Sequence, residues 1–223
     1  MMKFRHEWKH EINFSDMLVL RHRLKAVARC DPNAPDGKYF IRSLYFDTPN
    51  DKALMEKING ISRREKFRIR YYNGDTSFIR LEKKSKLDGL CGKQGASLTA
   101  DEVQALLCGD LDFIRFSENE LVRELYSKMN SQQLRPKTIV DYDREAFVYP
   151  AGNVRVTMDY NIRTGLYSTD FLDMDCVTVP VTGAVILEVK WDEFLPSAIR
   201  DAVQLEGRHT SSFSKYAACR IYD

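Results

Sequence analysis

Residues 65–84 read EKFRIRYYNGDTSFIRLEKK, a pattern that predicts two β-strands around a turn. Side chains alternate across a strand, so Lys66, Arg68 and Arg70 share one face while the apolar residues between them share the other. The Asn73-Gly74 step is typical of a two-residue hairpin turn, and the strand after it repeats the alternation. On these two strands alone, a charged face turned toward water is the simpler interpretation.

The composition is that of a globular protein without a generally basic surface. The chain has 223 residues, of which 43% are hydrophobic, enough for one substantial core or two small ones. Its net charge of +2 argues against a non-specific nucleic-acid binder but permits a local cationic cavity. The sequence has no apolar run of the roughly 18 residues that a membrane-spanning helix needs. Its five cysteines lack metal-ligand spacing and are expected to be reduced thiols in a cytoplasmic protein.

Alternating and helical spacings predict the remaining elements. Strands are expected over residues 4–14, 39–46, 138–149, 154–161 and 184–192. Helices are expected over residues 15–28, 49–60, 100–107, 118–129, 196–205 and 212–222, with Ser15, Thr99 and Ser117 as caps. The segment 89–95 holds Lys93 between glycines and is expected to be a turn, either a plain connector or a mobile ligand-binding loop. Without a repeat or a linker, one domain over residues 1–223 is expected.

Basic residues recur on one face of strand after strand. They are Lys9, Lys66, Arg68, Arg70, Arg80, Lys84, Arg144 and Arg155. A sheet with that many strands usually curls or closes. If its apolar faces pointed inward, the apolar stripes of the helices would have nothing to cover. We therefore expect the apolar strand faces to lie outward beneath the helices and the charged faces to line a tunnel.

Such a tunnel needs compensating charge, because buried like charges repel and are costly to desolvate. Acidic side chains, water or a bound polyanion can supply the compensation. A polyphosphate suits the forks of arginine and the ammonium groups of lysine, and a carboxylate such as Glu188 can hold the divalent cation that accompanies a triphosphate. The charge pattern therefore favours a polyphosphate ligand.

Ordered motifs along the chain resemble a known family. They are residues 5–9 (RHEWK), 43–47 (SLYFD), 66–73 (KFRIRYYN), 81–84 (LEKK), 142–144 (YDR), 154–156 (VRV), 187–190 (LEVK) and 213–216 (FSKY). Each motif is weak alone, but the set covers nearly the whole chain in one order. In that order it resembles the VTC domain, the polyphosphate polymerase domain of the vacuolar transporter chaperone complex, within the triphosphate tunnel metalloenzyme superfamily.

The resemblance implies an α+β fold, with a closed antiparallel β-barrel tunnel of about eight strands and flanking helices. It implies a phosphotransferase that uses Mn²⁺ or Mg²⁺ and moves the terminal phosphoryl group of ATP, or another nucleoside triphosphate, to an acceptor. The acceptor would be polyphosphate, pyrophosphate or orthophosphate. Such chemistry depends on positioning and charge neutralisation, so it needs no nucleophilic triad.

The resemblance also assigns roles to individual residues. The catalytic residues would be Lys9, Arg68, Arg70, Glu188 and Lys215, with Glu188 as the principal metal ligand. The substrate-binding residues would be Lys84, Lys93, Tyr142, Arg144, Arg155 and Ser214. The sequence leaves open whether Glu7 is a metal ligand or an ion-pair partner, and whether Lys66 and Arg80 are solvated charges at the rim.

Departures from related families keep two alternatives open. The CYTH branch of the superfamily has an N-terminal Glu-x-Glu-x-Lys strand, but Arg5 occupies the first position here. The loss of one carboxylate favours a longer anion, although hydrolysis of inorganic triphosphate remains an alternative. A catalytically silent polyphosphate-binding module is the second. The vacuolar proteins also carry an SPX domain and membrane helices, so a membrane partner of this chain would be encoded separately.

Overall fold

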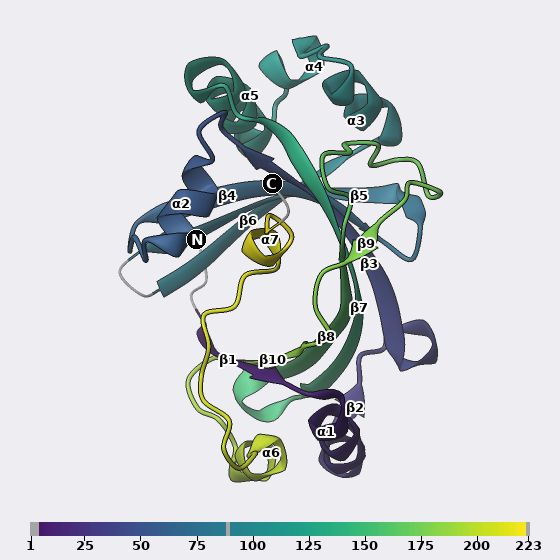
Figure 1. Ribbon diagram of the computed structural model, residues 1–223, viewed down its shortest axis with the longest axis vertical. Helices are drawn as coiled ribbons and strands as arrows, with labels where there is room; N and C mark the ends of the chain where they lie inside the picture. The colour runs from purple at the N-terminus through teal and green to yellow at the C-terminus, as the bar shows by residue number, and fades with distance from the viewer. Residues whose placement is uncertain (1–4, 88–89, 222–223) are drawn as a thin grey trace.

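A computed structural model describes residues 5–87 and 90–221, and its main feature is one strongly curled antiparallel sheet (Figure 1). The strands are β1 (His6–Ile12), β2 (Arg29–Cys30), β3 (Lys38–Asp47), β4 (Arg64–Tyr72), β5 (Asp75–Leu87), β6 (Leu90–Leu98), β7 (Arg135–Tyr149), β8 (Val154–Thr164), β9 (Val179–Pro180) and β10 (Val185–Trp191). Eight of them follow the order β1-β10-β8-β7-β3-β4-β5-β6, while β2 pairs with β7 and β9 pairs with β8. The predicted α+β class is confirmed.

The prediction of a closed barrel is wrong. Within the described residues, the edge strands β1 and β6 share no backbone pairing. The outer edge of β1 is taken by the C-terminal segment, because the Ser211 N–H donates to the Lys9 carbonyl at 2.7 Å and His10 pairs with Thr210. That edge is therefore not free for β6. The two sides of the opening meet instead through side chains, with Lys84 Nζ on β5 lying 3.7 Å from Glu7 Oε2 on β1.

The central hairpin forms as predicted. Asn73 and Gly74 have φ values of 51° and 74°, and two positive values are what a type I′ turn requires. Asparagine and glycine tolerate this left-handed conformation better than other residues. The resulting register places Arg68 opposite Glu82 and Lys66 opposite Lys84, so the charged faces of β4 and β5 become one surface.

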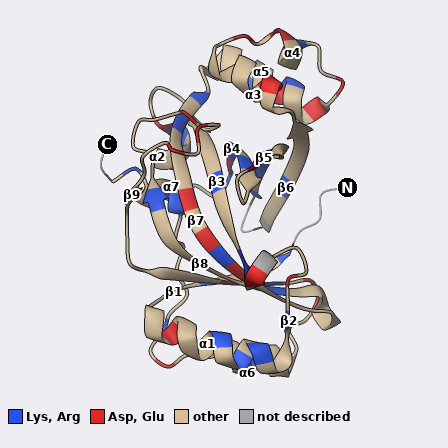
Figure 2. Ribbon diagram, turned by 90° about the vertical axis from the view of Figure 1, so that its right-hand side faces the viewer, with Lys and Arg blue, Asp and Glu red and all other residues tan. Residues whose placement is uncertain are grey.

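The helices pack on the outside of the curled sheet, as predicted. They are α1 (Phe14–Val27), α2 (Lys52–Ile58), α3 (Ala100–Leu107), α4 (Asp112–Arg115), α5 (Glu120–Gln132), α6 (Ser197–Val203) and α7 (Lys215–Ala218). One apolar cluster joins Phe67 and Leu81 to Leu125 under α3–α5, and another joins Leu20 and Leu187 under α1 and α6. Figure 2 shows α1 and α6 together on one side of the sheet. Helix α7 sits against the concave face, where Tyr216 stacks on Tyr45 at a centroid distance of 5.1 Å, and Leu54 of α2 packs against the same cluster.

Two of the predicted helix caps are wrong by two residues. Thr99 caps α3 as expected, because its hydroxyl accepts from the Glu102 N–H at 3.1 Å. The first and fifth helices are capped by Asn13 and Asn119 instead of the serines nearby. Asparagine and serine are equally good caps, so the position of the cap depends on where the preceding strand or turn ends.

The predicted turn over residues 89–95 is also wrong in its described part. Residues 90–98 form β6, which pairs with β5 and places Lys93 opposite Lys84; Gly89 lies outside the described residues. Gly95 faces Glu82, and a Cβ there would come within 2.9 Å of the Arg80 guanidinium. This glycine makes room for the Arg80 side chain within a strand, whereas its composition alone suggested a flexible turn.

Two further helices are shorter than predicted. The helix expected at Pro49 begins at Lys52, and the Asp47 carboxylate accepts from the N–H groups of Ala53 and Leu54. The last helix spans only four residues from Lys215, because the chain before it runs extended beside β1; Tyr222 lies outside the described residues. In the described part of the chain, no helix is long and apolar enough to cross a membrane.

Candidate active site

Among the described residues, three clusters of charged side chains lie on the concave face, each around buried or half-buried carboxylates. The carboxylates are Glu7 with Glu188, Glu82, and Asp159. Their cationic partners are Lys9, Arg68, Arg70, Lys84, Lys93, Arg144, Lys190 and Lys215. The cations outnumber the carboxylates, so the face retains a positive charge that a bound anion would neutralise.

The first cluster joins β1 and β10, because Lys9 lies directly opposite Glu188 in their register. Lys9 Nζ is 3.1 Å from both Glu7 Oε1 and Glu188 Oε2, and Lys190 also contacts both carboxylates. Burial alone would raise the pKa of Glu188, but Lys190, Lys9 and Lys84 outweigh it and hold that pKa well below its ordinary value. Both carboxylates are therefore ionised at neutral pH and within reach of one shared cation.

The second cluster surrounds Glu82 on β5. Arg68 donates to Glu82 Oε2 through Nε and Nη2 at 2.9 and 2.7 Å, and Lys93 Nζ lies 2.5 Å from Oε1. Arg70 lies 3.6 Å from the same carboxylate and donates to the Tyr142 hydroxyl at 2.9 Å. Burial opposes ionisation of Glu82, but the three cations lower its pKa. The structure thus brings four predicted site residues together, Arg68, Arg70, Lys93 and Tyr142, with Lys93 contributed by strand β6 instead of a turn.

The third cluster joins β7, β8 and the start of α7. Arg144 donates to both oxygens of Asp159 at 2.6 and 2.7 Å, and Lys215 Nζ is 2.5 Å from Oδ2. Burial would raise the pKa of Asp159, yet Arg144 and Lys215 lower it to about 2. Lys215 also lies over the ring of Tyr142, 4.7 Å from its centroid. This aspartate was not among the predicted site residues, although it lies on the same face of the same strand as Arg155.

Two predicted residues have mainly structural contacts. Arg155 pairs with Asp31 at 2.7 Å, and its side chain is 37% exposed. The Ser214 hydroxyl caps α7 by accepting from the Ala217 N–H. Ser214 nevertheless lines the same cavity of about 410 Å³ as Lys9 and Lys84.

Lys66 is a further cation of the concave face. It lies over the Tyr45 ring, 5.3 Å from the centroid, and forms no ion pair with a carboxylate of the described residues. Burial and the charges of Lys84, Arg68 and Lys9 lower its pKa well below the ordinary value. The sequence left open whether Lys66 was a solvated rim charge; its position among the other cations makes it part of the site.

The lowered pKa of Lys66 predicts a pH-dependent affinity for tripolyphosphate. A phosphate oxygen favours the charged ammonium, so binding should take up a proton whenever Lys66 is partly neutral in the free protein. Affinity is expected to fall as pH rises through the lowered pKa, well before the ordinary lysine value of about 10.4. In the Lys66→Arg variant, the guanidinium stays charged and the fall should move to higher pH. Calorimetry in buffers of different ionisation enthalpy measures the proton uptake; equal uptake by both proteins would contradict this role.

A hard divalent cation fits the first cluster. Mg²⁺ and Mn²⁺ prefer oxygen ligands, and Mg²⁺ is usually held by one or two carboxylates together with substrate phosphates. Glu7 and Glu188 offer such a pair, already bridged by the ammonium groups of Lys9 and Lys190. A group of three or more acidic, histidine or cysteine side chains suited to a metal is not found among the described residues. Any metal there would need phosphate oxygens to complete its coordination.

Comparisons with known proteins agree with this geometry. A sequence model of the VTC domain matches residues 4–221, whereas no curated protein matches the chain. A putative adenylyl cyclase from Hippeastrum, described as having a dominant triphosphatase activity, has 14% sequence identity and a TM-score of 0.58, covering 97% of this chain and 95% of that one. A putative adenylate cyclase from Bacillus halodurans also has 14% identity, with a TM-score of 0.52, covering 90% of this chain and 84% of that one.

The two structural matches show that the fold is shared. A sequence identity of 14% supports no conclusion about activity. The family match extends from the first strand to the end of the last helix, over the same ordered motifs that the sequence analysis singled out. The resemblance inferred from those motifs is therefore confirmed, and the chain belongs to the VTC domain family.

Proposed function

We propose that this protein is a metal-dependent polyphosphate polymerase. It would transfer the terminal phosphoryl group of ATP, or of another nucleoside triphosphate, to polyphosphate, pyrophosphate or orthophosphate. An oxygen of the acceptor phosphate forms a bond to the γ-phosphorus, the bond between that phosphorus and the bridging oxygen breaks, and ADP leaves with the electron pair. The observation that carries the proposal is the pair Glu7 and Glu188 set in an otherwise cation-rich concave site.

The residues of the three clusters have the chemistry that this transfer needs. Arginine forks such as Arg68 and Arg70 bind phosphate oxygens and neutralise the charge that spreads over them in the transition state. Lys9, Lys66 and Lys84 would hold the neighbouring phosphates, so that donor and acceptor lie in line. When an anion binds, these cations exchange part of their pairing with carboxylates for pairing with phosphates.

Glu188, with Glu7, would hold Mn²⁺ or Mg²⁺ against the phosphates of the donor. The metal would supply further charge neutralisation on the oxygens of the transferring group and of the leaving diphosphate. In the metal-free protein, Lys9 and Lys190 hold these two carboxylates in place. A module that only binds anions has no need for two ionised carboxylates among its cations, so the pair favours an enzyme.

A triphosphate hydrolase is the second candidate. The structural neighbour from Hippeastrum is described as having a dominant triphosphatase activity, and the same clusters would bind inorganic triphosphate. In that reaction water replaces the acceptor phosphate and orthophosphate is released. The two reactions differ only in the acceptor, so the product distinguishes them directly.

The test is to incubate the purified protein with ATP and Mn²⁺, with and without a short polyphosphate primer. Chain length on a gel, ADP and released orthophosphate are followed together. The proposal expects polymer growth, matched by ADP release and stimulated by the primer. Orthophosphate without polymer would support the hydrolase instead. Neither product, combined with tight binding of polyphosphate, would leave a catalytically silent binding module, with any membrane partner still to be found.

A further inference from the structure

The charged face of the β4–β5 hairpin continues beyond the predicted site residues. Along the two strands, Arg70 lies opposite Arg80, Arg68 opposite Glu82, Lys66 opposite Lys84, and Arg64 opposite Lys86. Like charges directly opposite each other destabilise a sheet. Glu82 is the single acidic member of these rungs, and the last two rungs carry cations only. We call the last pair, Arg64 and Lys86, the outer rung.

Helix α2 adds a third cation beside the outer rung. Lys57 lies in its last turn, and burial together with the positive charges of Arg64 and Lys86 lowers the pKa of this lysine. Within the described residues, no carboxylate forms an ion pair with any of the three; Lys57 donates to the Ser212 hydroxyl at 3.0 Å and Arg64 donates to the Ile61 carbonyl. Glu65, next to Arg64 in sequence, is engaged by Lys83 and Lys128 instead, and Glu56, next to Lys57, lies 3.9 Å from Lys52.

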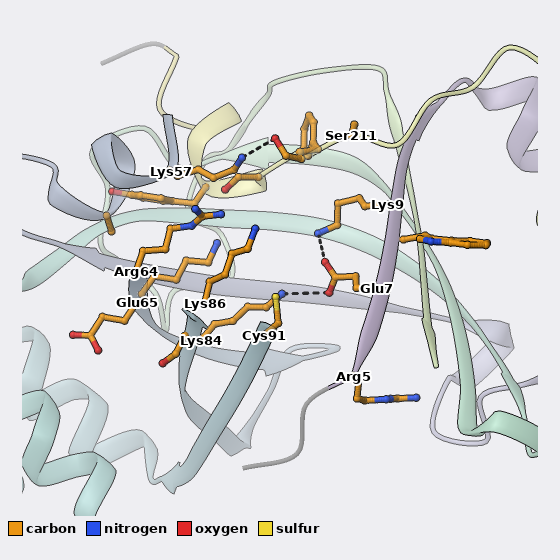
Figure 3. A pocket seen from close by; sticks show the side chains of 18 of the residues that line it. Arg5, Glu7, Lys9, Lys57, Arg64, Glu65, Lys84, Lys86, Cys91 and Ser211 are labelled. Carbon is orange, nitrogen blue, oxygen red and sulfur yellow. Dashed lines mark hydrogen bonds and ion pairs between the residues drawn. The ribbon is translucent and has the colours of Figure 1, made fainter. Parts of the chain in front are cut away.

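The three cations share a cavity with the predicted site. Lys57, Arg64 and Lys86 line the same space of about 410 Å³ as Lys9 and Lys84. In Figure 3 they point into this space from α2, β4 and β5, facing Glu7 and Lys9 across it; Glu65 also lines the cavity, but its carboxylate is turned away from the three cations. The outer rung is thus an extension of the site and not an isolated patch of surface charge.

The length of this extension matters for the ligand. From Arg70 to Arg64 the strand covers about 20 Å, at the usual rise of ~3.3 Å per residue. A triphosphate is shorter than that distance, and the cations around Glu82 and Glu188 can meet its charge. We propose that Lys57, Arg64 and Lys86 form an accessory subsite that binds the distal phosphates of a linear polyphosphate. The inference rests on the proposed function. It adds which end of the site holds the polymer.

The subsite is tested by comparing a long and a short ligand without metal or nucleotide. The triple variant Lys57→Gln, Arg64→Gln, Lys86→Gln is titrated with long-chain polyphosphate and with tripolyphosphate. Affinity for the long chain is expected to fall on the order of 10-fold, since half-exposed ion pairs each contribute modestly. Its dependence on salt should become shallower, because fewer phosphate contacts release fewer counterions. Affinity for tripolyphosphate should stay close to that of the unmodified protein.

A matched control removes the same charge elsewhere. The variant Lys25→Gln, Arg29→Gln, Arg115→Gln loses three cations that do not line the cavity, and it should bind both ligands normally. Equal losses for the long and the short ligand would overturn the subsite, because they would reflect only the general positive field. Unchanged binding of the long chain would overturn it too. If the unmodified protein makes polymer while the subsite fails this test, the proposed function survives; if it neither makes polymer nor binds polyphosphate, both fail.

Discussion

Replacing Glu188 with glutamine should lower the rate of polymer formation by about 10²–10³-fold, the loss typical of removing one preorganised electrostatic group from an active site. The same change removes a negative charge from a site in which cations are already in excess. Affinity for tripolyphosphate in the presence of a chelator is therefore expected to stay equal or to rise. A fall in turnover without a fall in metal-free binding identifies a carboxylate that serves the metal rather than a structural ion pair.

Glu145→Gln is the matched control for this experiment. Glu145 is also buried, and it is paired with Arg21 at 2.6 Å, but it contacts α1 on the outer side of the sheet. Its loss should affect stability and leave turnover of the folded protein unchanged. Turnover is read from chain length and ADP release, and binding from calorimetry. If Glu188→Gln kept normal turnover, or lost metal-free binding in proportion to turnover, the metal-ligand role would be wrong.

Replacing Asp159 with asparagine should destabilise the ligand-free protein by about 3–5 kcal/mol, the usual cost of leaving buried charges without their partner. Asp159 is fully buried, and both Arg144 and Lys215 depend on it. Because these two cations face the site, a bound polyanion can replace the lost carboxylate. Tripolyphosphate should therefore stabilise the variant more than it stabilises the unmodified protein, as measured by urea unfolding with and without the ligand.

The pKa of Asp159 gives this prediction a pH dependence. The folded-state pKa of about 2 is lower than the ordinary aspartate value of about 3.9. The ion pair therefore contributes fully above the ordinary value, and its contribution is lost as the pH falls through that value toward about 2. The difference in unfolding free energy between the two proteins should be constant near neutral pH and should shrink in this acidic window.

The Asp141→Asn variant is the control for this experiment. It removes a buried ion pair that does not face the candidate site, so it shows which effects come from the loss of any buried ion pair. Asp141 is as buried as Asp159, and it pairs with Arg42 at 2.9 Å. Arg42 also donates to the Asp173 carbonyl, in the loop before β9. This variant should be destabilised to a similar degree, but tripolyphosphate should give it no extra stabilisation. Equal stabilisation of both variants by the ligand would contradict the placement of Arg144 and Lys215 in the anion site.

The sequence was sufficient for seven of the eight strands in the main order of the sheet, all except β6, and for the side of the sheet that carries charge. Period-two alternation around Arg68 and Glu188 is a local signal, and it survives folding because a strand has only two faces. The same rule would have extended the site by one rung, since Arg64 and Lys86 continue the alternation on either side of the hairpin. Asp159 was likewise recoverable, because it follows Arg155 by four residues on the same face.

Other features depend on contacts that no local pattern contains. The choice of Asn13 over Ser15 as a cap depends on where β1 ends, and the shape of residues 90–98 depends on pairing with β5. The sheet stays open because Thr210 and Ser211 of the C-terminal segment, and not β6, pair with the outer edge of β1. These are tertiary effects, and they override propensities that are small by comparison.

The unpaired seam between β1 and the β5–β6 side has a consequence for how a polymer is loaded. A barrel closed by backbone hydrogen bonds admits a linear chain only by threading from a free end. Here, within the described residues, the two sides are joined through charged side chains, Glu7 and Lys84, whose attraction is screened by salt. If the protein binds polyphosphate as proposed, a chain with both ends blocked should therefore be able to enter from the side when the contact between Glu7 and Lys84 breaks, and its binding should be faster at higher salt.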